Sequence, residues 1–320
     1  MKPGCMQRGA AGRPWWGGAG LLLLLVVALA GPGPAGAASP DKIPTAASIL
    51  PLGDFLDQLG GERIQVTVLI PPGASPHVFE PSPAAVAEAA KARVLVYVGA
   101  GLDPWVSRLV ARRGPDDPGV VQATAGLPLI AEVAPHSHGH HPGKGAAHRH
   151  EQGNPHVWLD PVLAQDICRR IATALMAVDP EYREYYQGNL SRYLAELEAL
   201  HREIEAAVAS FRLKEFVSFH PAFTYFARRY GLTEAGVIEA APGREPTPGH
   251  LKRLAAQLKK SGARAVFAEP QLSPRAAEVL AREAGVKVLI LDPLGGRPPY
   301  GRDYLKLMRH NLAVMQQALQ

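Results

Sequence analysis

Residues 181–211 read EYREYYQGNLSRYLAELEALHREIEAAVASF, without proline and with a single glycine. Large apolar residues recur there at spacings of three and four, which is the pattern of one apolar face on a helix. This face comprises Leu190, Tyr193, Leu194, Leu197, Leu200, Ile204, Val208 and Phe211. The pattern predicts a helix of about 30 residues, or about 45 Å at 1.5 Å per residue. A helix this long is unusual in an α/β protein, and we expect it to span two lobes.

Short apolar segments alternate with helical patterns on both sides of this helix. The predicted strands cover residues 43–50, 64–70, 94–98, 215–219, 237–238, 265–268 and 286–291. The predicted helices cover residues 51–60, 83–92, 103–113, 222–230, 248–260, 274–284 and 303–319. Asp103 is expected to cap the third of these helices. Such alternation is typical of a parallel sheet covered by helices.

We therefore predict an α/β protein of two lobes, each a mostly parallel sheet flanked by helices. The first lobe is assigned to residues 38–180 and the second to residues 213–320. The long helix, residues 181–212, joins them, and a ligand cleft is expected between the lobes, because open α/β sheets bind ligands beyond the carboxyl ends of their strands.

The first 37 residues have the three-part layout of a secretory signal. Three basic residues precede an apolar run of ten at residues 21–30, and Ala35-Gly36-Ala37 is typical of a cleavage site. Ten apolar residues are too few to cross a bilayer core of about 30 Å as a helix. We expect a cleavable signal peptide and a periplasmic protein; an uncleaved anchor is the alternative.

The charge balance argues against a nucleic-acid partner. Residues 1–37 hold three basic residues and no acidic one, so the rest of the chain has 31 basic against 29 acidic residues, from totals of 34 and 29. A mature chain so close to neutrality lacks the basic surface that phosphate binding needs.

Three histidines and one aspartate lie where predicted strands end or where a helix opens: His77, His156, His220 and Asp292. Three imidazoles and a carboxylate form a typical tetrahedral zinc set. Each residue also has a structural interpretation, since a histidine after a strand can serve as a loop hydrogen-bonding group. Asp292 can equally cap a helix or form a turn.

A second histidine signal lies within residues 136–150. This stretch contains six histidines in fifteen residues, namely His136, His138, His140, His141, His148 and His150. A histidine-rich tract is typical of metal binding, although a solvated linker would also fit. Because ordering a glycine-rich segment costs entropy, we expect a weak auxiliary site and not the main one.

Five segments resemble the motifs of one family. They are PPGASPHVFEPSP at 71–83, NPHVWLDP at 154–161, SFHPAFTYF at 218–226, FAEPQ at 267–271 and LDPLG at 291–295. In this order they resemble the metal-binding (cluster A-I) substrate-binding proteins of ABC transporters, and most of all the high-affinity zinc uptake ZnuA type. The resemblance runs from about residue 42 to the end of the chain.

The resemblance implies two lobes on one long helix and a Zn²⁺ ligand, the transported ion, in the cleft. Matched by motif, His77 and His156 come from the first lobe, and His220 and Asp292 from the second. Manganese-type relatives usually have glutamate at the third position, so His220 favours zinc. Some zinc-type members carry an acidic residue where this chain has Pro76, which leaves Asp292 or a water as the fourth ligand. The implied partners are the permease and ATPase of an importer, with the chain itself a monomer and not an enzyme.

Three other functions remain open from the sequence. The first is a manganese-type binding protein. The second is a secreted zinc hydrolase, because three histidines and a water form the open site of catalytic zinc, with Glu80, Asp160 or Glu269 as general base; neither the H-E-x-x-H nor the G-x-S-x-G motif is present. The third is a structural or adhesive protein that binds metal incidentally.

Overall fold

A computed structural model describes the chain over residues 42–114, 116–131, 153–239 and 245–320. The predicted signal peptide and the histidine-rich stretch at 136–150 lie outside the described residues. Within the described ranges, no helix combines the length and the apolarity that a membrane crossing requires.

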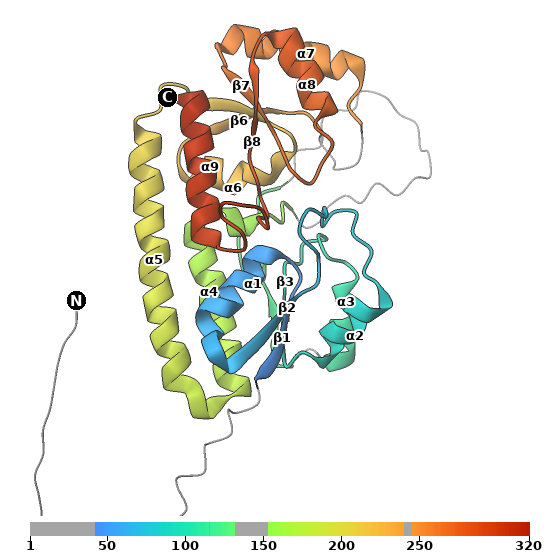
Figure 1. The fold of residues 1–320 in the computed structure, drawn as a ribbon, viewed down its shortest axis with the longest axis vertical. Coiled ribbons are helices and arrows are strands. Elements are labelled where there is room, and N and C mark those ends of the chain that lie inside the picture. The colour runs from blue at the N-terminus through green and yellow to red at the C-terminus, as the bar shows by residue number, and fades with distance from the viewer. Residues whose placement is uncertain (1–41, 115, 132–152, 240–244) are drawn as a thin grey trace, which may run out of the picture. The chain divides into compact units, whose positions relative to one another are not determined.

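The first lobe contains a four-stranded parallel sheet (Figure 1). Its strands are β1 (Ile43–Ala47), β2 (Ile64–Val68), β3 (Val94–Tyr97) and β4 (Val120–Gln122), in the order β2-β1-β3-β4. The parallel sheet is confirmed, but β4 was not predicted from the sequence. With three residues, of which two are apolar, β4 is too short to show a periodic pattern.

The helices that accompany this sheet are α1 (Leu50–Gly60), α2 (Pro83–Lys91), α3 (Val106–Arg113) and α4 (Pro161–Val178). The predicted cap of the third helix is wrong, because α3 begins three residues after Asp103. The buried Asp103 carboxylate instead accepts hydrogen bonds from the backbone N–H groups of Val98 (2.7 Å) and Gly99 (2.8 Å). It therefore tightens the turn that follows β3.

The second lobe holds two parallel strand pairs. One pair is β5 (Glu215–Ser218) with β6 (Thr233–Val237), and the other is β7 (Ala265–Ala268) with β8 (Lys287–Ile290). Strand β5 lies beside β7, so the two pairs are neighbours. Helices α6 (Thr224–Arg229), α7 (Pro248–Ser261) and α8 (Arg275–Ala284) accompany them.

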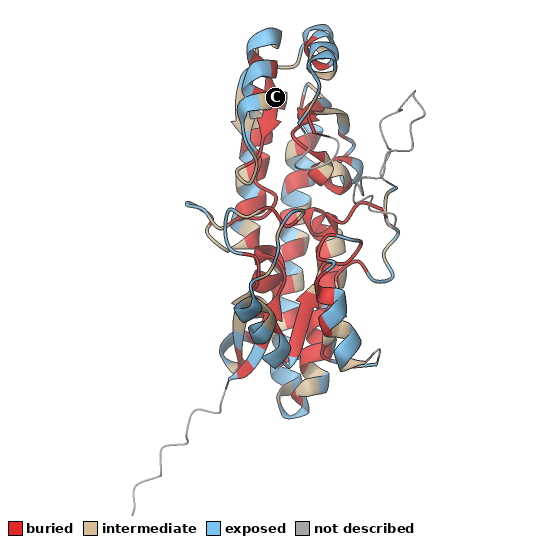
Figure 2. Ribbon diagram, turned by 90° about the vertical axis from the view of Figure 1, so that its right-hand side faces the viewer, coloured by how far each residue is buried: buried red, intermediate tan, exposed pale blue. Residues whose placement is uncertain are grey.

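The long helix is confirmed as α5 (Arg183–Ala209), which packs against α1, α4 and α9 (Tyr304–Leu319). Its 27 residues correspond to about 40 Å. The buried face consists of Tyr186, Leu190, Tyr193, Leu197, Leu200, Ile204 and Val208. Figure 2 marks the buried residues in red. In the first lobe they make up most of β1 and β3, whereas β2 and β4 hold one buried residue each. One apolar core thus continues along α5 from Phe55 in the first lobe to Phe216 in the second.

Helix α9 brings the end of the chain back against the first lobe. The backbone N–H of Tyr304 donates to Asp54 Oδ2 (3.1 Å), and its hydroxyl donates to the carbonyl of Trp158 (2.7 Å). Trp158 Nε1 in turn donates to the carbonyl of Pro293 (2.8 Å). We call these four residues, Asp54, Trp158, Pro293 and Tyr304, the α9 junction. It joins the two lobes through buried groups in addition to α5.

Candidate metal site

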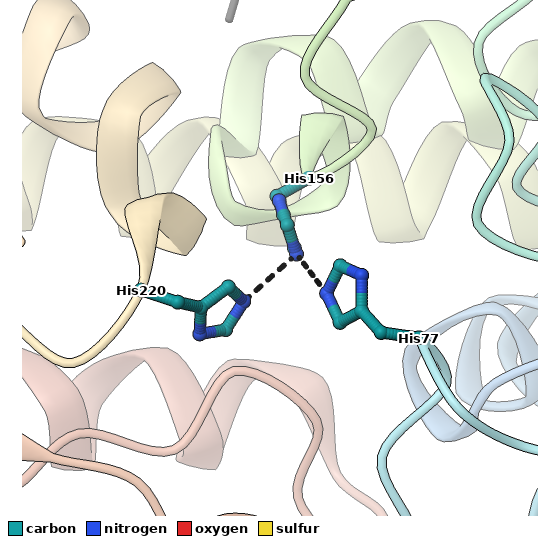
Figure 3. Close-up of side chains that lie close together, drawn as sticks. All are labelled: His77, His156 and His220. Atoms are coloured by element: carbon teal, nitrogen blue, oxygen red, sulfur yellow. Dashed lines mark hydrogen bonds between the residues drawn. The ribbon is translucent and has the colours of Figure 1, made fainter. Parts of the chain in front are cut away.

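Three histidines from distant parts of the chain meet in one pocket (Figure 3). His77 lies in the proline-rich loop between β2 and α2, and His156 lies just before the short 3-10 turn that precedes α4. His220 lies two residues beyond the carboxyl end of β5, which ends at Ser218. Each histidine has a proline as its chain neighbour, which narrows the backbone conformations open to these loops.

The reactive ring nitrogens converge on one point. His156 Nε2 lies 3.2 Å from His77 Nε2 and 3.1 Å from His220 Nε2. Tetrahedral Zn²⁺ with N ligands at 2.0–2.1 Å places those nitrogens about 3.3 Å apart. The two pairs that include His156 therefore have the spacing that a single ion of this size requires, and the ligand atoms of all three rings lie within 4.8 Å of one another.

The three rings differ in exposure. His156 and His220 are only 2% and 3% exposed, while His77 is half-buried and is followed by Val78, which is 64% exposed. The pocket is walled by apolar groups, among them Trp158 and Leu294. Such a wall limits water access and strengthens the interaction between a cation and its ligands.

The Nδ1 atoms of both buried rings face oxygen atoms. His156 Nδ1 lies 2.9 Å from Asn154 Oδ1, and His220 Nδ1 lies 2.5 Å from Glu269 Oε1. Amide and carboxylate oxygens are acceptors, so each Nδ1 carries the proton and donates it. This tautomer leaves the Nε2 lone pair directed at the point where the three rings meet, as metal-binding histidines require.

Asp292 follows β8, as its predicted position requires, but it is not part of the three-histidine group. Its carboxylate is fully buried and accepts four hydrogen bonds. Oδ1 accepts from Gln271 Nε2 (2.8 Å) and from the N–H groups of Leu294 and Gly295 (both 3.0 Å), and Oδ2 accepts from the Tyr300 hydroxyl (2.7 Å). Binding a metal would require Asp292 to exchange one of these bonds, and its role as a ligand stays a prediction.

The sequence did not predict that Glu269 and Asn154 would be the Nδ1 partners of the two buried histidines. Glu269 was considered only as the base of a hydrolase, and Asn154 only as part of a motif. The strand-end argument covers Glu269 as well, because it directly follows β7 beside β5. Asn154 offers no such signal, since its role depends on how the chain turns over the two residues before His156.

Comparison with known proteins identifies the family. The family described as zinc-uptake complex component A, periplasmic, matches residues 46–318. The chain belongs to this family. The resemblance of the five segments to the ZnuA type is therefore confirmed, and so is the two-lobe α/β fold around a long helix.

Two relatives show how much of the chain is shared. The high-affinity zinc uptake system protein ZnuA of Bacillus subtilis (strain 168) is 30% identical over 283 residues, which cover 87% of this chain and 88% of that protein. The zinc-binding protein AdcA of Streptococcus pyogenes serotype M3 is 31% identical over 288 residues, 86% of this chain and 56% of AdcA. The chain thus spans little more than half the length of AdcA.

Solved structures of the ZnuA type have the same fold. A crystal structure of ZnuA aligns with a TM-score of 0.74 at 29% identity and covers 87% of this chain and 99% of that one. The laminin-binding protein Lmb of Streptococcus agalactiae, described as a bifunctional protein with adhesin and metal transporting activity, also has a TM-score of 0.74, at 30% identity over 86% of this chain and 99% of its own.

Proposed function

We propose that this chain captures Zn²⁺ with His77, His156 and His220 and delivers it to the permease of an ATP-driven importer. The observation that carries the proposal is the convergence of three Nε2 atoms from both lobes on one point. Membership in a zinc-uptake family supports zinc as the cargo. Neutral imidazole is also a ligand type that zinc favours over the oxygen ligands typical of manganese.

A water completes the tetrahedral site in this proposal. The Asp292 carboxylate already accepts four hydrogen bonds, and two of the donors, Gln271 and the N–H of Leu294, belong to residues that line the pocket. Asp292 therefore holds part of the pocket wall in place. Direct ligation by Asp292 is the alternative. Asp292→Asn distinguishes the two arrangements, because it should reduce zinc affinity strongly only if the carboxylate binds the ion.

Capture and release involve no bond chemistry. The bases that a hydrolase would need are either engaged or exposed to solvent. Glu269 accepts a hydrogen bond from Nδ1 of His220, on the side of the ring opposite Nε2. Asp160 caps α4 and pairs with Arg229, and Glu80 is exposed. These positions support a binding protein and not an enzyme.

The decisive experiment is metal binding by the full chain purified without an affinity tag. We expect one tight Zn²⁺ per chain by competition with a chelating indicator, with Mn²⁺ unable to displace it at equal concentration. Affinity should fall as the solution is acidified, because protons compete with zinc for the same nitrogens. A dissociation constant weaker than micromolar would favour incidental binding, and preferential Mn²⁺ binding would favour a manganese carrier.

The remaining parts of the proposal have their own tests. Deletion of residues 136–150 should leave the tight site in place and remove only weaker binding. Export should be visible by mass spectrometry as a mature chain that begins after Ala37. Zinc-limited growth of a cell that depends on this chain should require the three histidines if delivery to a permease is its task.

A further inference from the structure

The side chain of Asn154 connects the segments that carry two of the three histidines. Its Oδ1 accepts from both the backbone N–H (3.0 Å) and Nδ1 (2.9 Å) of His156. Its Nδ2 donates to the carbonyl of Pro221 (2.6 Å), the residue after His220, and lies 3.4 Å from Thr224 Oγ1. With 2% exposure, Asn154 makes these contacts in the interior of the protein.

The orientation of this amide follows from chemistry. A backbone N–H only donates and a backbone carbonyl only accepts, so Oδ1 must face His156 and Nδ2 must face Pro221. His156 Nδ1 consequently has to be the protonated nitrogen. One side chain therefore fixes the tautomer of a histidine in the first lobe and at the same time holds the turn that carries a histidine of the second.

The Pro221 turn is itself anchored to the second lobe. Thr224 Oγ1 donates to Glu234 Oε2 (2.8 Å) on β6, and Glu234 Oε1 accepts from Ser218 Oγ (2.5 Å) on β5. The turn to which Asn154 donates a hydrogen bond is thus fixed to strands β5 and β6.

We propose that Asn154 is a positioning residue that sets His156 and His220 at metal-binding distance before zinc arrives. This inference rests on the proposed function, because it assigns Asn154 a task only if those histidines bind the ion. Outer-shell partners of ligand histidines typically change metal affinity by about 10- to 100-fold when they are replaced.

The test compares three variants with the wild type in zinc competition titrations. Asn154→Ala removes the hydrogen bonds to both His156 and Pro221, and the Kd of this variant for Zn²⁺ should rise by about 10- to 100-fold. Asn154→Asp keeps the acceptor for His156 and loses the Nδ2 donor to Pro221, while its carboxylate makes His156 a more basic ligand, so its Kd should be clearly lower than that of Asn154→Ala. Tyr225→Phe is the matched control, because it removes the 2.8 Å hydrogen bond to the Asn154 carbonyl and the acceptor of the Ile130 N–H (3.0 Å) but leaves the Asn154 side chain in place. Its Kd should stay within about threefold of the wild type.

A second measurement reads the tautomer directly. Two-dimensional NMR of imidazole-labelled wild-type protein without metal should show His156 protonated at Nδ1, and Asn154→Ala should populate the Nε2-protonated form. The wild-type spectrum decides this point even if Asn154→Ala does not fold.

The outcomes separate the two proposals. An Nε2-protonated His156 in the wild type, an unchanged Kd in Asn154→Ala, or a Kd in Asn154→Asp as high as that of Asn154→Ala would each overturn the role of Asn154. His156→Ala is the reference for the site itself. If that variant still binds zinc tightly, the proposed function fails, whatever the Asn154 variants do.

Discussion

Two of the places where the lobes meet differ in how their polar groups are used. At the α9 junction, donors and acceptors from the two lobes bond to each other directly, as Tyr304 does with Asp54 and Trp158. At the histidine pocket, Asn154 also bonds directly to Pro221, but the three histidine rings from both lobes are aimed at a common point between them. The polar groups of the α9 junction thus satisfy one another, whereas the three rings of the histidine pocket are arranged as a cation site would require.

This difference indicates how the protein would open. A closed α9 junction and a continuous core along α5 resist wide separation of the lobes. His156 and His220 are buried and held by Asn154 and Glu269, whereas His77 lies half-buried on a loop. We therefore expect the His77 loop to admit the ion to two preset rings, with small shifts between the lobes.

The largest expected effect comes from breaking the pocket. His220→Ala and His156→Ala each remove a buried ring of the proposed site, and zinc affinity should fall by about a thousandfold or more, equivalent to about 4 kcal/mol. Competition titration measures this loss. His201→Ala is the matched control, because its ring bonds to Tyr230 and not to the pocket; a loss of similar size there would show that the titration reports general loosening.

Breaking the α9 junction should change stability and leave zinc affinity alone. Burial raises the pKa of Asp54 from 3.8 to about 6, although the N–H of Tyr304 and the hydroxyl of Tyr193 favour its charged form. In the pH range between those values the folded chain holds a proton that the unfolded chain has lost. The free energy of unfolding therefore decreases as the pH rises through that range.

Asp54→Asn removes this titration. The metal-free wild type should lose about 2 to 3 kcal/mol of its free energy of unfolding between pH 4 and pH 7 through this group, and the variant should not. The difference in free energy of unfolding between variant and wild type should therefore grow by this amount over the same pH range. Urea unfolding at several pH values measures the difference. Asp166→Asn, a half-exposed carboxyl on α4 that pairs with Arg169, controls for the loss of one surface charge. A pH-independent difference for Asp54→Asn would contradict the assigned burial effect.

The sequence predicted the parts of this comparison that depend on local pattern. The spacing of apolar residues predicted α5, and the positions after strands predicted that His77, His156 and His220 would lie at related edges. The α9 junction and the Nδ1 partners were not predicted, because they depend on which groups the folded chain brings opposite each other. Asp103 shows the same limit: a cap and a turn use the same residue type, and only the turn geometry after β3 decides between them.

A smaller effect on zinc affinity is expected from changing the Nδ1 partner of one buried histidine of the proposed site. His156 donates to a neutral amide and His220 to the Glu269 carboxylate, which should make His220 the more basic ligand. Glu269→Gln would give both rings an amide partner and should weaken zinc binding by about 10- to 100-fold. Glu234→Gln removes a half-buried acid that bonds Ser218 and Thr224 and not a ring. An equal loss in that variant would show that total charge matters and not the contact with His220.

The smallest effect is expected at Asp292, and it decides what completes the site. If a water is the fourth ligand, Asp292→Asn should change zinc affinity by less than about threefold, because the amide oxygen can still accept from the N–H groups of Leu294 and Gly295. If the carboxylate binds the metal, the loss should approach that of a missing histidine. Tyr300→Phe distinguishes the two further, since it releases Oδ2 from a 2.7 Å hydrogen bond while the charge stays. Tighter zinc binding in that variant would mean that the released Asp292 carboxylate binds the ion. All four zinc ligands would then come from the protein, and this contact between the lobes, like the α9 junction, would need no water.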